Sequence, residues 1–192
     1  MPWYPRAVRR PLPESGKQGS IKPRAIILHT AVDARTPNSS IFPYFARADV
    51  DVESHFYVFD NGVVEQYMDT VERADANVSA NGFAVSIETE DDGAPEQRGW
   101  TVEQLASIID LCSWLCNTHG IPRRQIESPA GSGIGWHAMW GLNNPWTLAR
   151  GKTCPGMPRI AQIKSVILPA LTRGSDMLSD SDVERVAEAV WT

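Results

Sequence analysis

The sequence has few cysteines, no long apolar segment and no surplus of positive charge. Three cysteines do not make the disulfide framework of a small secreted protein. No segment is apolar over a membrane-spanning length, and the start of the chain lacks the apolar stretch of a signal peptide. We therefore expect a protein that is made and kept in a cytoplasm, without membrane insertion. A net charge of -5 argues against a nucleic-acid-binding protein, which needs a basic face.

The composition is instead that of one folded domain. Of the 192 residues, 42% are apolar and 21% are charged, which supplies a sizeable core and excludes global disorder. We expect an N-terminal arm over residues 1–23, a single domain over residues 24–174, and a polar linker with a short helix over residues 175–192.

Apolar periodicity and turn signals predict an α/β fold. Asn61-Gly62 separates two runs rich in aromatic and β-branched residues, which is a strong hairpin signal. Thr101 and Gln104 form a capping box at the start of a helix. We expect strands over 24–31, 54–60, 63–68 and 84–90, and helices over 36–48, 101–119 and 157–172. This order indicates one domain with a central mixed β-sheet flanked by helices.

Three residues have the side chains of a zinc site. His29 ends an apolar run, His137 follows a glycine-rich loop over 131–136, and Cys154 lies in a turn-like segment. Zinc prefers nitrogen and sulfur ligands, and three protein ligands leave one position open for water. Taken singly, each residue is also compatible with an ordinary role, as a hydrogen-bonded strand-end histidine or a small buried cysteine.

The remaining cysteines and one further histidine lie on the 101–119 helix. Cys112 and Cys116 share one side of this helix, and we expect them in the core; a zinc or redox pair is the alternative, although no second Cys/His pair lies at a suitable spacing. His119 ends the helix, where its dipole favours a cation, and we place it outside the site.

Two carboxylates lie on one face of the strand predicted over 84–90. Glu88 and Glu90 alternate with Val85, Ile87 and Thr89. Burying two carboxylates on one face is costly, so this face must meet solvent, a cation or a cleft.

Four segments occur in an order that resembles zinc N-acetylmuramoyl-L-alanine amidases: IILHTA at 26–31, SHFYVFDNGVVEQY at 54–67, AVSIETE at 84–90 and GWHAMW…GKTCPG within 135–156. This is the amidase-2 and peptidoglycan-recognition (PGRP) superfamily, and the last segment looks most like endolysins of phages that infect actinobacteria. The resemblance covers roughly residues 20 to 172. It implies an amidase-2/PGRP-like fold and one Zn2+ held by His29, His137 and Cys154.

The resemblance also implies catalytic roles. Glu88 occupies the position of the catalytic glutamate of related phage amidases, where it would act as general base. Glu90 is the main alternative, expected nearer to solvent at the strand end. Lys152 precedes Cys154 as a lysine does in phage-lysozyme amidases, and it would stabilise the oxyanion. An ordinary surface lysine is the alternative.

The chain departs from part of the family at one position. Some members have a catalytic tyrosine before the histidine of the His-Phe strand, whereas this chain has Ser54 before His55, so Glu88 must carry more of the acid–base role. Tyr57 shares a strand face with His55, but the sequence does not place it relative to the site. His55 itself resembles a residue near the substrate groove, and a hydrogen-bonded structural role is equally compatible with it.

An insertion over 139–150 separates the last two expected ligands. Its Trp140 and Trp146 are suited to stacking on sugar rings, and we expect the insertion to form a wall of the substrate groove. The alternative is a loop held in place by its own aromatic side chains.

The leading hypothesis is zinc-dependent hydrolysis of the amide bond between N-acetylmuramic acid and L-alanine in peptidoglycan. The resemblance implies a phage endolysin that stays in the host cytoplasm until lysis and then acts on the cell wall, and we expect a monomer. A non-catalytic peptidoglycan-binding protein and a zinc peptidase that cuts within the stem peptide are the alternatives. A closed structural zinc site would need a fourth protein ligand, for instance His55.

Overall fold

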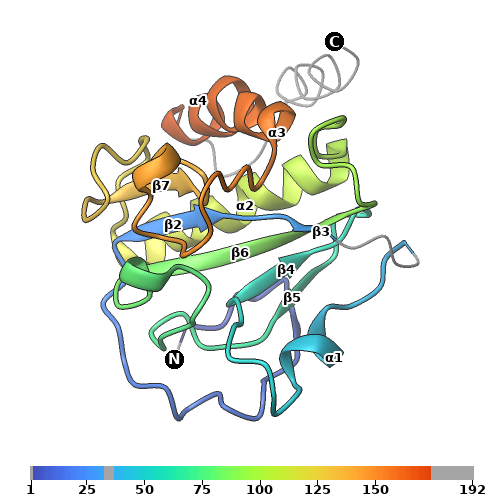
Figure 1. Ribbon diagram of the computed structural model, residues 1–192, viewed down its shortest axis with the longest axis vertical. Helices are drawn as coiled ribbons and strands as arrows, with labels where there is room; N and C mark the ends of the chain where they lie inside the picture. Colours follow the sequence, from blue (N-terminus) through green and yellow to red (C-terminus); the bar gives the residue numbers. More distant parts are fainter. Residues whose placement is uncertain (1, 33–36, 174–192) are drawn as a thin grey trace.

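The computed structural model describes residues 2–32 and 37–173 (Figure 1). The linker and short helix expected over residues 175–192 lie outside the described residues. Across the part of the chain that is described, no helix has both the length and the apolar character needed to cross a membrane.

A mixed β-sheet forms the centre of the fold, with the strand order β1-β5-β4-β6-β2-β7. Strands β4, β6, β2 and β7 run parallel to one another, and β5 pairs antiparallel with β4. The bounds are β1 Val8–Arg9, β2 Ala25–Leu28, β4 Phe56–Val58, β5 Val64–Gln66, β6 Ala84–Asp91 and β7 Gly133–Trp136, while β3, Ala31–Val32, pairs with the end of β6. The expected mixed sheet is confirmed.

Helices cover one face of this sheet (Figure 1). Ile26, Leu28, Val85 and Ile87 point to that face, where they pack with apolar residues of α2 and of the last helix. The opposite face carries loops and the short α1. The helical segments are α1 Phe42–Phe45, η1 Val78–Ala80, α2 Val102–His119, η2 Gly141–Asn143, α3 Met157–Gln162, η3 Ile163–Ile167 and α4 Leu168–Thr172.

Several local predictions hold in the structure. The side chain of Thr101 accepts a hydrogen bond from the backbone of Gln104, and the side chain of Gln104 accepts one from the backbone of Thr101, so the capping box is formed. Cys112 and Cys116 are buried in the core. The helix expected over 157–172 has the predicted extent, but η3 in its middle is a π-helix. The helix expected over 36–48 is confined to the single turn α1.

The glycine-rich segment before His137 is a strand and not the expected loop. All four residues of β7 are buried, and β7 pairs in parallel with β2. A Cβ atom on Gly135 would lie 2.9 Å from the side chain of Ile126 and 3.2 Å from that of Trp146. Glycine is therefore needed here for close packing, whereas the expectation of a loop rests on the flexibility of glycine.

The N-terminal segment also packs onto this fold. Strand β1 pairs in parallel with β5 at the edge of the sheet. Tyr4 and Leu12, on either side of β1, are buried, at 7% and 3% exposure. The segment before residue 24 therefore adds both an edge strand and apolar contacts.

We predict that Gly135→Ala lowers the free energy of unfolding by about 1–3 kcal/mol, because the added methyl group overpacks a filled space. Gly82→Ala is the matched control, since nothing lies within 4 Å of a Cβ atom at that position. Urea unfolding of both variants measures the difference. Equal stability of the two variants would contradict the packing argument for β7.

Candidate metal centre

The sheet register places the expected site residues in one row. Strand β2 lies between β6 and β7 and pairs in parallel with both. His29 and His137 follow directly after β2 and β7, and their backbone N–H groups continue the two ladders, with bonds of 2.9 and 3.1 Å to the neighbouring strands. His29 therefore lies beside Glu88 of β6 on one side and beside His137 on the other. Tyr57 of β4 is the register partner of Glu88.

The ligand atoms of His29, His137 and Cys154 lie within 4.8 Å of one another. The two imidazole rings have their centroids 4.4 Å apart, and both histidines are buried, whereas Cys154 is half-buried. The sulfur of Cys154 accepts a hydrogen bond of 3.2 Å from the backbone N–H of Thr30. The structure thus brings together three residues that are far apart in the sequence, with the donor set that zinc prefers.

Hydrogen bonds fix which nitrogen of each imidazole faces the cluster. Nε2 of His29 lies 2.7 Å from Oδ1 of Asn77, and Nε2 of His137 lies 3.1 Å from the backbone oxygen of Trp146. Since both partners are acceptors, Nε2 carries the proton in each ring and Nδ1 keeps its lone pair. Such outer hydrogen bonds are the usual support of a metal-binding histidine.

The surroundings favour neutral imidazoles. Burial lowers the pKa of His29 well below its usual value, and the nearby His137 adds to this effect. Burial and the charge of Lys152 lower the pKa of His137 to about 4. Burial raises the pKa of the Cys154 thiol to about 12, with Glu88 contributing in the same direction. A thiolate at this position therefore needs a compensating cation, which a bound metal supplies.

Glu88 is the carboxylate that faces the cluster. Its Oε1 lies 3.6 Å from Nδ1 of His29, and its Oε2 is buried with no hydrogen-bond partner among the described residues. Burial raises the pKa of Glu88 to about 8, although the positive charge of Lys152 acts in the opposite direction. A carboxylate with an unused oxygen beside a metal site has the features expected of a proton acceptor.

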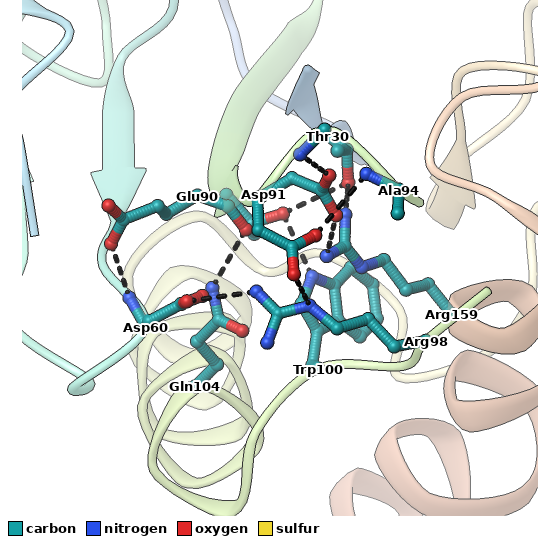
Figure 2. Close-up of polar contacts among 12 residues, drawn as sticks. Thr30, Asp60, Glu90, Asp91, Ala94, Arg98, Trp100, Gln104 and Arg159 are labelled. Atoms are coloured by element: carbon teal, nitrogen blue, oxygen red, sulfur yellow. Dashed lines mark hydrogen bonds and ion pairs between the residues drawn. The ribbon is translucent and has the colours of Figure 1, made fainter. Parts of the chain in front are cut away.

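Glu90, the alternative base, has a different environment from the one expected. Its side chain is buried and not at the rim: Oε2 accepts a bond of 2.8 Å from the N–H of Asp60 (Figure 2). Its Oε1 accepts one of 3.3 Å from the N–H of Ser39. Backbone donors from two loops therefore satisfy both oxygens. This leaves Glu88 as the better candidate.

Lys152 is exposed and acts on the cluster through its charge. Its positive charge lowers the pKa values of Glu88, His29 and His137, the pattern of a cation lying close to all three. This position is compatible with the oxyanion role expected from the sequence.

Two of the expected substrate-binding residues, His55 and Trp146, are buried, which favours the structural alternative for each. His55 is fully buried: its Nε2 donates to the backbone oxygen of Glu72 at 2.9 Å, and its Nδ1 accepts from the N–H of Ser86 at 3.1 Å. It is therefore available neither to substrate nor as a fourth metal ligand. Trp146 is also fully buried, and its Nε1 donates to the backbone oxygen of Pro129 at 3.0 Å.

Trp140 differs from Trp146 in exposure. It is half-buried and packs edge-on against Trp146, with the ring centroids 5.4 Å apart. This packing favours a loop held in place by its own aromatic residues, in which Trp140 keeps part of its surface exposed. His119, at the end of α2, contacts Thr70 and does not join the cluster, as expected.

Asn77 supports the cluster and is not predicted by the sequence. It is fully buried, and its backbone N–H donates to Oδ1 of Asn81 at 2.6 Å, which holds it against His29. The next residue, Val78, has φ of 43°, a left-handed conformation that β-branched residues avoid. No local pattern in the sequence singles out Asn77, because its partner, His29, follows a strand that is distant in the sequence.

A His-His-Cys cluster beside a carboxylate has the ligand count of a catalytic zinc site, since structural sites use four protein ligands. The chain belongs to the N-acetylmuramoyl-L-alanine amidase family Amidase_2, whose family model matches residues 19–157. The expected enzyme class is thereby confirmed. No curated protein matches the sequence significantly.

Solved structures show the same architecture. The endolysin N-acetylmuramoyl-L-alanine amidase LysCS from Clostridium intestinale URNW is 20% identical, covers 76% of this chain and 83% of its own, and has a TM-score of 0.54. The catalytic domain of XlyA is 18% identical, with 86% and 98% covered and a TM-score of 0.59. A mutant of PlyL is 16% identical, with 88% and 99% covered and a TM-score of 0.63. These similarities confirm the expected amidase-2 fold.

We predict that Cys154→Ser weakens zinc binding and reduces the rise in melting temperature that zinc produces, because metal binding stabilises only the folded state. The matched control is Cys116→Ala, which changes a buried cysteine of the core away from the cluster. Calorimetry with and without zinc measures both effects. Stoichiometric zinc with unchanged affinity in Cys154→Ser would remove this residue from the ligand set.

Proposed function

We propose that this protein is a zinc-dependent N-acetylmuramoyl-L-alanine amidase that cleaves the bond between N-acetylmuramic acid and the L-alanine of the stem peptide. The observation that carries the proposal is the placement of Glu88 3.6 Å from His29, beside the His29–His137–Cys154 cluster. Family membership supports the choice of amide and of peptidoglycan as substrate.

His29, His137 and Cys154 would hold the zinc ion through two neutral imidazoles and one thiolate. When bound, zinc lowers the pKa of a coordinated water and polarises a carbonyl group. The hydrogen bonds from Nε2 of His29 and Nε2 of His137 keep both rings oriented toward the cluster. The three residues therefore form a preorganised set that needs little rearrangement.

Glu88 supplies the proton transfer and Lys152 the charge stabilisation. Glu88 accepts the proton of the attacking water on its unpaired Oε2 and then passes it to the leaving nitrogen of L-alanine. Lys152 places a positive charge near the oxygen that becomes negative in the tetrahedral transition state. Partial burial raises the pKa of the Glu88 carboxyl to about 8, which suits a group that takes up and releases a proton during the reaction.

The biological setting that we propose is phage lysis of an actinobacterial host. The sequence resembles endolysins of such phages, and the similar structure from Clostridium intestinale is that of an endolysin amidase. The protein would act as a monomer, remain in the host cytoplasm until lysis and then degrade the cell wall. The presence of Cys154 argues against a purely peptidoglycan-binding role, because binding relatives typically lack this ligand.

We predict that Glu88→Gln retains zinc and the fold but lowers turnover by about 100- to 10,000-fold, since it removes the proton acceptor and keeps the shape. Glu90→Gln is the matched control on the same strand face, because Glu90 binds backbone N–H groups and not the cluster. Steady-state release of stem peptide measures turnover. Near-normal turnover of the Glu88 variant would exclude it as the base.

The reaction itself is tested by mass spectrometry of actinobacterial peptidoglycan after digestion with the zinc-loaded protein. We expect stem peptides with a new N-terminal alanine, lost on chelation and restored by zinc. Cuts within the stem peptide would instead show a peptidase. Folded, zinc-loaded protein that binds wall fragments without cutting them would show a binding protein.

A further inference from the structure

An ion pair between Arg159 and Asp91 is completely buried near Thr30, the residue that follows His29 (Figure 2). Arg159 lies in α3, shortly after Cys154, and Asp91 is the last residue of β6. Removing two charges from water costs free energy that their attraction often fails to recover. The pair is therefore weak evidence for stability, and its placement needs another explanation.

The guanidinium of Arg159 reaches the residue that connects two metal ligands. One Nη group binds Asp91, and the other donates to Oγ1 of Thr30. Thr30 follows His29 in the chain, and its backbone N–H donates to the sulfur of Cys154 at 3.2 Å. Thr30 is thus joined covalently to one ligand and by a hydrogen bond to another.

The hydroxyl groups extend this network to the strand of Glu88. Oγ1 of Thr89 donates to the backbone oxygen of His29 at 2.8 Å and accepts from Nε1 of Trp100 at 2.8 Å. Its only proton is used in this way, so the hydroxyl of Thr30, 3.2 Å away, donates to Thr89. His29 and Glu88 point to the open face of the sheet, which is the face not covered by α2 and the last helix. Thr30 and Thr89, one residue further along, point to the helical face, which these helices cover.

We propose that Arg159 is a positioning residue of the metal centre, which, paired with Asp91, fixes Thr30 and through it the distance between Cys154 and His29. The inference rests on the proposed zinc site but not on which amide is cut. Cys154 comes from a loop, whereas both histidines extend from strands, so it is the ligand that most needs such support. Arg159 ties the helix after this loop to the ends of β2 and β6.

The test measures zinc affinity by competition with a chromophoric chelator and the Co2+ absorption spectrum, which reports ligand geometry. Thr30→Val removes the hydroxyl that Arg159 binds and keeps the backbone N–H that reaches Cys154. Arg159→Lys keeps a charge for Asp91 but loses the forked geometry. We expect zinc affinity to fall about 10- to 100-fold in each variant, with a changed Co2+ spectrum. The double variant should lose less zinc-binding free energy than the two single variants lose together, because both changes act on one contact.

Gln162→Met is the matched control. Gln162 lies in α3 with Arg159, is buried, and bonds the backbone N–H and C=O of Trp100 at 2.6 and 3.1 Å. The Gln162→Met variant should have a lower thermal stability, with zinc affinity and the Co2+ spectrum unchanged. Unchanged affinity in folded Thr30→Val and Arg159→Lys, or an equal loss in Gln162→Met, would overturn the positioning role alone. A parent protein that binds neither metal would overturn this role and the proposed zinc site together.

Discussion

The parallel pairing of β2 with both β6 and β7 is the constraint on which the site depends. Because both pairings share one register, the residues at the carboxyl ends of these strands form a row across the sheet. His29, Glu88 and His137 meet on the open face for this reason alone. A slip of one residue would turn them to the helical face and bring Thr30 and Thr89 outward. The apolar residues that alternate with them fix the register, since they fill the core under α2.

Burial then gives the row its chemical character. It keeps the imidazoles neutral and raises the pKa of the Glu88 carboxyl, which are the conditions for metal binding and proton exchange. The same region holds polar atoms that the fold leaves without partners among the described residues, namely Oε2 of Glu88 and Nδ2 of Asn77. The left-handed Val78 follows Asn77. Unsatisfied groups and local strain of this kind concentrate at functional sites, where they are kept for chemistry and not for stability.

The sequence predicts those features that local patterns encode. The hairpin around Asn61-Gly62, the capping box at Thr101 and the alternation of β6 each depend on a few neighbouring residues. The set of His29, His137 and Cys154 comes from the resemblance of the surrounding segments to zinc amidases, because each residue taken singly is also compatible with an ordinary structural role. The mixed sheet follows from the order of the elements.

The residues that the sequence places poorly are those whose surroundings are set by distant partners. The polar side chains of His55 and Glu90 suggest places in the substrate groove and at the rim, yet backbone groups of Glu72 and Asp60 satisfy them in the interior. Trp146 is held in the core by Pro129. The glycines of β7 suggest a loop because glycine is more often flexible than closely packed. In each case the deciding contact joins segments that are separate in the sequence.

The long insertion between His137 and Cys154 shows how the fold keeps a loop-borne ligand in place. Within it, the backbone oxygen of Trp146 accepts a hydrogen bond from His137, and shortly after it the backbone oxygen of Cys154 accepts a bond of 2.8 Å from the N–H of Ala138. Beyond it, Arg159 ties α3 to the sheet. Lengthening a loop costs little entropy once its ends are fixed, since the cost grows only with the logarithm of loop length. The insertion can therefore vary in length and surface, including the exposed part of Trp140, without moving the ligands that it connects.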